Sequence, residues 1–152
     1  MDQRFEDFLA LSVILTGFSR WQLLGTAMAA TYLSRLDESL PGGVLDDLLS
    51  AYRQLPQGAE RDAAIASGML ADARLGPVVR NLILLWYRGF WSALPSDWHN
   101  AYGAASHTDN SGYVSAMAYQ SGLQWIAAGA HPPGSSQEGF GSWSVLPERS
   151  GL

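Results

Sequence analysis

The chain has 152 residues, a net charge of −5 and no cysteine, which excludes disulfides, thiolate metal sites and a cysteine nucleophile. Every basic residue is arginine and none forms a basic patch, so nucleic acid and anionic membrane surfaces are poor candidates for direct partners. Charged residues make up only 15% of the sequence, against ~25% in a typical globular protein. A surface so poor in charge favours a permanent protein partner.

The first half of the sequence has the apolar periodicity of amphipathic helices. Apolar residues recur at three- and four-residue steps over residues 2–15, and Gly17 is expected to end that helix. A second helix is predicted over residues 19–36, where Ser19 and Gln22 form a capping box and Gly25 indicates close packing against another helix. Shorter helices are predicted over residues 44–52 and 60–70.

The second half begins with the most apolar helix of the chain. This helix has Pro77 in its first turn and is apolar nearly all round, so a central position between neighbouring helices is expected. Residues 95–110 show no period and are expected to form a loop. A last helix is predicted over residues 113–128, and no regular structure after Gly129.

These patterns together predict an all-α fold, a compact bundle of about six helices with an irregular C-terminal arm. No strand is predicted. The bundle domain is expected to span residues 1–128. The arm, residues 129–152, is rich in proline, glycine and aromatic residues and is expected to pack on the bundle or on a partner protein.

Three segments carry a resemblance to a known family. They are Leu9-Ala-Leu-Ser-Val-Ile-Leu-Thr-Gly17, Leu84-Leu-Trp-Tyr-Arg-Gly89, and Tyr113-Val-Ser-Ala-Met117, the last followed by a Pro-Gly segment, Trp143 and Pro147. In this order and at these separations, the chain resembles the small (gamma) subunit of membrane-bound FAD-dependent sorbitol, fructose and glucose dehydrogenases. The resemblance extends over nearly the whole chain.

The resemblance implies a non-catalytic role. In that family, FAD and the alcohol oxidation belong to a large subunit of the glucose-methanol-choline type, and a multihaem cytochrome c subunit accepts the electrons. The small subunit binds the large one, helps it mature and usually carries the export signal. This chain is therefore expected to contain no cofactor itself, to stabilise a flavoprotein partner, and to meet the membrane only indirectly.

Two features depart from the family pattern. No export signal is recognised at the N-terminus, so the periplasmic location that the resemblance implies and a cytoplasmic one both stay open. Family members often have a cysteine near the junction of the last helix with the arm, where this chain has Gly129-Ala-His131-Pro132. The missing cysteine counts against a covalent or haem-proximal role for the junction. It does not affect the expected packing role.

Aromatic and proline-rich positions are the candidate partner interface. Trp86 and Phe90 are expected in the core, on one face of the central helix. Tyr87 and Trp91 share another face, where they either pack against a second helix or lie exposed as interface anchors. The full set of expected interface residues is Tyr87, Trp91, Tyr113, His131, Pro133, Phe140 and Trp143.

Catalytic and metal sites receive little support from the sequence. His99, His107 and His131 are too far apart for a helical ligand pair, and ordinary hydrogen bonds are the favoured interpretation. No Gly-x-Ser-x-Gly elbow and no Gly-x-Gly-x-x-Gly fingerprint is present. Two alternatives to the accessory subunit stay open: a free-standing helical interaction module, and a small enzyme with His99 or His107 as general base.

Overall fold

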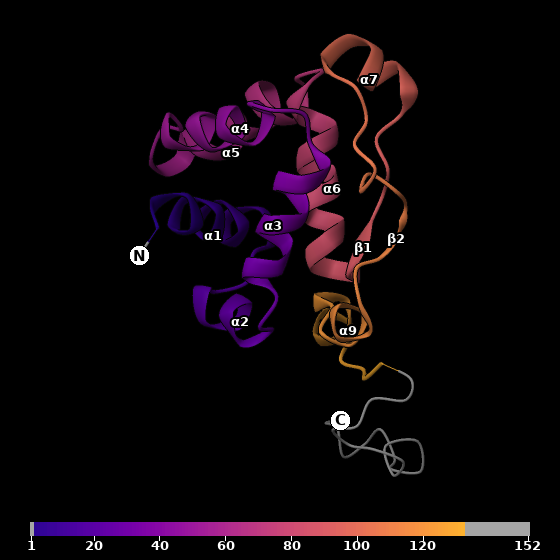
Figure 1. Cartoon of the computed structure of the whole chain (residues 1–152). Helices are drawn as coiled ribbons and strands as arrows, with labels where there is room; N and C mark the ends of the chain where they lie inside the picture. Colours follow the sequence, from indigo (N-terminus) through magenta and orange to yellow (C-terminus); the bar gives the residue numbers. More distant parts are fainter. Residues whose placement is uncertain (1, 133–152) are drawn as a thin grey trace.

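The structure is a computed structural model that describes residues 2–132 (Figure 1). Over that range the fold is all-α, as the sequence predicts, with one small two-stranded ladder in addition. The α-helices are α1 (Gln3–Thr16), α2 (Arg20–Gly25), α3 (Ala29–Ser39), α4 (Val44–Arg53), α5 (Arg61–Ile65), α6 (Leu75–Arg88), α7 (Ser96–Tyr102), α8 (Ala116–Gln120) and α9 (Leu123–Ala128).

Shorter elements join these helices. A 3-10 turn, η1 (Gly58–Glu60), leads into α5, and a π-helical segment, η2 (Ala66–Leu70), follows it. Strands β1 (Phe90–Trp91) and β2 (Gly112–Tyr113) pair antiparallel, with Phe90 opposite Tyr113 and Trp91 opposite Gly112. The ladder was not predicted, because two residues per strand are too few to produce an alternating pattern.

The predicted end of the first helix and the predicted start of the second are confirmed. The side chain of Asp2 accepts a hydrogen bond from the Arg4 amide at the start of α1, and Gly17 ends that helix in the left-handed conformation with φ 79°. The capping box at the start of α2 is present, since the Ser19 and Gln22 side chains each bond to the other residue's backbone N–H.

The helix predicted over residues 19–36 is two helices. Thr26 lies at the break, where its hydroxyl donates to the Leu23 carbonyl (2.7 Å) and accepts from the Met28 amide (3.1 Å). Such local bonds compete with the hydrogen bonds of a continuous helix. At the next residue, Ala27, the backbone leaves the helical conformation with a positive φ of 62°. The predicted close packing at Gly25 is also wrong, because a Cβ there would meet no atom within 4 Å.

The region after α6 contains shorter elements than predicted. The expected loop over residues 95–110 contains α7, and the helix expected over residues 113–128 is divided into β2, α8 and α9. A Cβ at Gly122, between α8 and α9, would lie 2.6 Å from the Tyr87 carbonyl oxygen. The close approach of α6 to this turn is a tertiary contact, which helical periodicity does not reveal.

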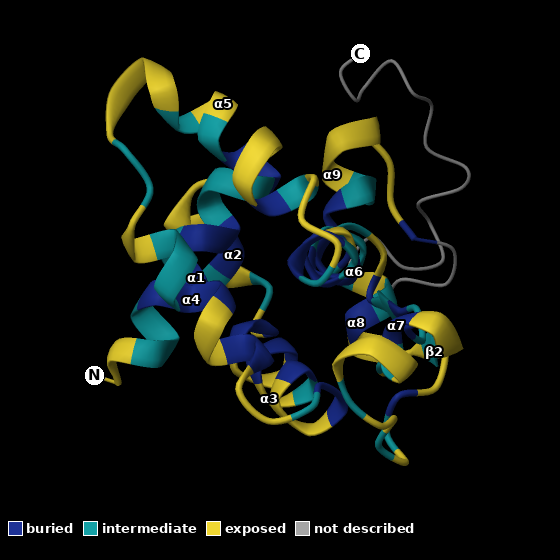
Figure 2. Cartoon of the chain, turned by 90° about the horizontal axis from the view of Figure 1, so that it is seen from above, coloured by how far each residue is buried: buried dark blue, intermediate teal, exposed yellow. Residues whose placement is uncertain are grey.

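Helix α6 forms the centre of the molecule, as its apolar sequence predicts. It contacts α1, α9, η2 and β1, and Figure 2, which views the chain from above, shows the buried residues gathered where α1, α3, α4 and α6 face one another. Trp86 of α6 is 1% exposed and packs against Tyr32 and Phe8, with ring centroids 5.0 and 6.2 Å away. No helix within residues 2–132 is both long and apolar enough to cross a lipid bilayer.

Candidate functional site

Residues 9–17, 84–89 and 113–117 meet at the C-terminal end of α6. Gly89 ends α6 with φ 67°, and its carbonyl accepts a hydrogen bond from the Val114 amide (2.9 Å). A Cβ on Gly89 would lie 2.4 Å from the Ala118 carbonyl oxygen, so only glycine fits there. The Tyr87 hydroxyl donates to the carbonyl of Thr16 at the end of α1 (2.8 Å). One backbone hydrogen bond and one bond from a side chain to the backbone therefore join all three segments at one place.

A row of aromatic rings lies beside this junction. Tyr113 packs edge-to-face on Phe90 (5.2 Å between centroids) and on Tyr119 (5.3 Å), and Tyr119 packs on Trp125 (5.6 Å). The Trp125 indole N–H donates to the Tyr119 carbonyl (2.9 Å). We name Phe90, Tyr113, Tyr119 and Trp125 the aromatic face. Tyr113 is 51% exposed and the other three rings are half-buried.

Two further apolar side chains are exposed on the helices that carry Tyr119 and Trp125. Met117 of α8 and Ile126 of α9 are 56% and 57% exposed. A shallow, mainly apolar hollow of about 450 Å³ lies over Tyr113, Ser115, Ala116 and Tyr119. Partly buried aromatic rings and exposed methionine are both enriched in protein-docking surfaces. The aromatic face is therefore the strongest candidate for a partner interface among the described residues.

A groove between α2 and α9 adjoins the aromatic face through Trp125. The groove has a volume of about 290 Å³ and is lined by Gln22, Gly25, Thr26, Gln120, Ser121, Gly122, Trp125, Ile126, Ala130, His131 and Pro132. Trp21, 78% exposed, precedes Gln22 on α2. Figure 1 shows α2 and α9 at the same end of the molecule. His131, an expected interface residue, is exposed at this groove.

The structure separates the two expected interface residues at the end of the central helix. Trp91 is 0% exposed, so the alternative in which it lies exposed as an anchor is wrong for the isolated chain. It lies beyond α6, on β1, because Gly89 ends the helix first. Tyr87 is half-buried and packs edge-to-face on Phe18 at 5.9 Å. Phe90, expected in the core with Trp86, is only half-buried on the aromatic face.

A buried carboxylate organises the segment around Trp91. Asp109 has 7% exposure and accepts from the Trp91 indole N–H (2.7 Å), while its other oxygen lies 2.6 Å from His99 Nε2. The Leu94 amide lies 3.3 Å from that second oxygen. Because each of these groups has a hydrogen-bonded partner, the cluster satisfies the rule for buried polar groups. It holds α7 and the following loop against β1.

The same geometry bears on the enzyme alternative. His99 Nδ1 lies 2.7 Å from the Gly103 carbonyl oxygen, which can only accept, so this nitrogen carries a proton. Nε2 is occupied by Asp109. Both ring nitrogens of His99 thus have hydrogen-bond partners within the chain, and this geometry gives no support to His99 as a general base. His107 is exposed in the loop. Within residues 2–132, no three His, Asp or Glu side chains are placed so that they could hold a metal ion together.

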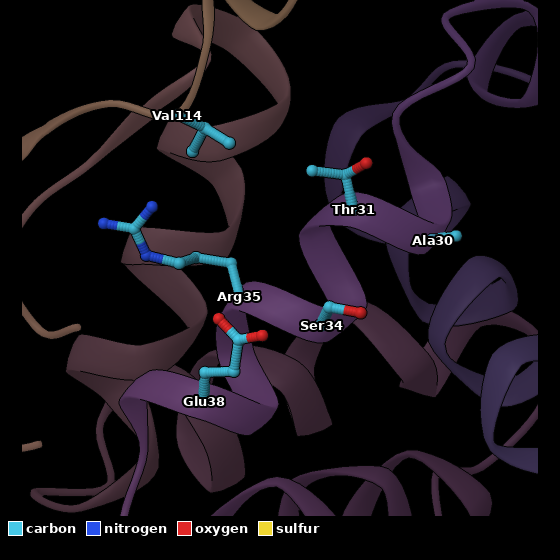
Figure 3. Close-up of a pocket in the computed structure, with 6 residues that line it drawn as sticks. All are labelled: Ala30, Thr31, Ser34, Arg35, Glu38 and Val114. Atoms are coloured by element: carbon cyan, nitrogen blue, oxygen red, sulfur yellow. The ribbon is translucent and has the colours of Figure 1, made fainter.

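A further hollow of about 360 Å³ lies between α3 and Val114 (Figure 3). Thr31, Ser34, Arg35 and Glu38 line it from α3. The Arg35 guanidinium lies over the Trp91 ring (5.8 Å to the centroid) and donates to the Asn110 carbonyl (3.2 Å). Arg35 thus holds the segment around Asn110 against α3. Among the residues that line this hollow, no hydroxyl is hydrogen-bonded to a side chain that could act as its base.

The sequence identified part of this surface. Tyr113 and His131 are exposed, and an interface role for them stays a prediction. Pro133, Phe140 and Trp143 lie outside the described residues. Sequence reasoning missed the following exposed or half-buried side chains: Trp21, Phe90, Met117, Tyr119, Trp125 and Ile126. Trp21 could have been found, since it lies off the apolar side of its helix.

Comparison with known proteins adds no relative. No family model, no curated protein and no solved structure matches this chain.

Proposed function

We propose that this chain is a non-catalytic accessory subunit that binds and stabilises the FAD-containing large subunit of a sugar or polyol dehydrogenase. The proposal rests on the resemblance of three segments to the small subunits of sorbitol-type dehydrogenases, and on the aromatic face. This face is the observation that carries it, because a row of half-exposed rings is suited to burial by a second polypeptide.

The mechanism of such a subunit is physical. Binding only the folded, flavin-competent form of the large subunit stabilises that form by mass action. Tyr113 and Met117 would supply the apolar contact, and the hydrogen-bonded segments behind them would keep the rings in place. FAD and the alcohol oxidation would belong to the large subunit, and haem c to a third subunit.

Co-expression with a flavoprotein of the glucose-methanol-choline type from the same genome tests the proposal. Size-exclusion chromatography of the tagged chain should show a stable complex that contains FAD. Replacing both Tyr113 and Met117 by serine should weaken the complex at least ten-fold, since each loses an apolar anchor. Tyr102→Ser is the matched control, because Tyr102 is also exposed but lies on α7. A clean monomer that never associates with the flavoprotein would contradict the proposal.

A free-standing helical interaction module is the second candidate function. The same aromatic face favours it, because nothing in the geometry of the face requires a flavoprotein. The two functions differ in flavin retention: an accessory subunit should raise the FAD content of the purified large subunit, whereas an unrelated interaction module should leave it unchanged. Measuring the flavin absorbance per large subunit, with and without this chain, distinguishes them.

A further inference from the structure

Another pocket lies away from the aromatic face, on α1, α4 and α5. It has a volume of about 270 Å³ and is lined by Asp7, Ile14, Tyr52, Arg53, Leu55, Pro56, Gln57 and Arg61. These residues come from α1, from the end of α4 and the loop after it, and from the start of α5. Figure 1 shows α4 and α5 at the opposite end of the molecule from α9. Neither the resemblance nor the proposed function assigns a role to this pocket.

Two arginines give the pocket a positive charge. Asp7, only 5% exposed, accepts from Gln3 (2.9 Å) with one oxygen and from the Arg53 guanidinium with the other. One carboxylate faces two guanidinium groups, so the lining carries an excess of one positive charge. This local excess is opposite in sign to the chain's net charge of −5. The ion pair with Asp7 also fixes the position of the Arg53 fork.

Among the side chains that line this pocket, Arg61 is the one with a buried nitrogen that has no partner; Arg35 Nε and Trp86 Nε1, elsewhere in the described residues, share this property. The Arg61 Nε is buried and forms no hydrogen bond, and within residues 2–132 its guanidinium forms no ion pair. A buried N–H without an acceptor is unfavourable by about 1–3 kcal/mol, so an acceptor from outside the chain, a water molecule or a ligand, would stabilise it. A guanidinium prefers a planar carboxylate, which accepts two parallel hydrogen bonds.

The remaining walls indicate the rest of the ligand. Ile14, Leu55 and Pro56 supply apolar surface, and Tyr52 and Gln57 add a phenol and an amide. A π-helical segment, η2, follows directly after the short helix that begins with Arg61. Such segments occur frequently at functional sites. We propose that this pocket binds a small organic acid, with its carboxylate between Arg61 and Arg53 and its apolar part against Ile14, Leu55 and Pro56.

Benzoate and benzamide form a matched pair of probes, because they differ in charge but hardly in shape. Titration of the isotope-labelled full chain, followed by NMR, should show saturable benzoate binding in the millimolar range or tighter, with the largest shifts at Arg61 and Gln57. Benzamide should bind at least ten-fold more weakly. Inorganic phosphate should also bind more weakly than benzoate, because it makes no use of the apolar wall.

Variants identify the residue that binds the carboxylate. Arg61→Gln should weaken benzoate binding at least ten-fold, and Arg61→Lys by a smaller factor, since lysine keeps the charge and loses the fork. Arg80→Gln is the control, because it removes the same charge outside the pocket. Equal binding of benzoate and benzamide, phosphate binding as tight as benzoate, or benzoate affinity unchanged by Arg61→Gln would each overturn the proposal. The experiment needs no flavoprotein, so its outcome is independent of the proposed function.

Discussion

The part of the chain up to α6 and the part after it are built in different ways. Residues 3–88 contain four helices of 10–14 residues, α1, α3, α4 and α6, whose apolar sides meet in one core. Residues 90–128 form elements of two to seven residues, held by side-chain hydrogen bonds, by ring contacts and by backbone contact with the end of α6. The second part has little core of its own, so its rings remain partly exposed and available to a partner.

The largest expected effect lies in the first part. Trp86→Ala removes a ring packed between Tyr32 and Phe8, and should reduce the free energy of unfolding by about 3–5 kcal/mol. Chemical denaturation followed by circular dichroism measures the loss. Trp21→Ala is the matched control, because Trp21 is 78% exposed and its replacement should change stability little. A similar loss in both variants would show that α6 is not the centre of the fold.

The next effect should be confined to the second part. Asp109→Asn leaves His99 and the Leu94 amide with a weaker acceptor, and should reduce stability by about 3 kcal/mol. Hydrogen exchange should increase over residues 90–114 while α1 and α6 stay protected. Asp97→Asn, on the exposed side of α7, should change neither quantity appreciably. Uniform loss of protection across the chain would remove the distinction between the two parts.

The junction between the parts can be tested with a pair of glycines. Gly89 and Gly129 both end helices in the left-handed conformation, with φ values of 67° and 69°. Gly129→Ala should reduce stability by ~1–2 kcal/mol, because only the backbone conformation is unfavourable there. Gly89→Ala should reduce it further, since its Cβ would also overlap the Ala118 backbone. Equal losses, measured by thermal unfolding, would show that the junction tolerates a side chain.

The smallest effect concerns pH. The Arg4 guanidinium lowers the pKa of the Asp37 carboxyl through a hydrogen-bonded ion pair. The pair therefore contributes stability above the carboxyl's unfolded pKa, and this contribution is lost as the pH falls through the lowered folded pKa. Because the pair is exposed, the contribution should be below ~1 kcal/mol. In Asp37→Asn, the free energy of unfolding should fall less steeply as the pH is lowered. An unchanged fall would show that the Arg4–Asp37 pair does not contribute to stability.

Much of the first part could be predicted because its information is local. Apolar side chains at helical spacing, the Asp2 and Ser19 caps and the left-handed Gly17 all act within a few residues, so the sequence contains them directly. The break at Thr26 was missed because a threonine hydroxyl can either bond within the helix or compete with it. Neighbouring residues alone do not decide between these outcomes.

The candidate site was less predictable. Tyr113 could be selected as an exposed ring, but its neighbours in the aromatic face come from β1, α8 and α9. Trp91 could not be distinguished from an exposed anchor, because its burial depends on Asp109, which is 18 residues away. The pocket at Arg61 likewise combines α1 with α4 and α5, so no single segment of the sequence contains it.

Composition and periodicity are local properties, and they are enough to predict the all-α class, the central place of α6, the absence of cysteine chemistry and the small share of charged residues. The folded chain was needed to show which aromatic rings are buried, how the segment after α6 is divided, and which arginines share a pocket. These properties depend on contacts between residues far apart in the chain, where a single carboxylate or the lack of a Cβ changes which side chains reach the surface.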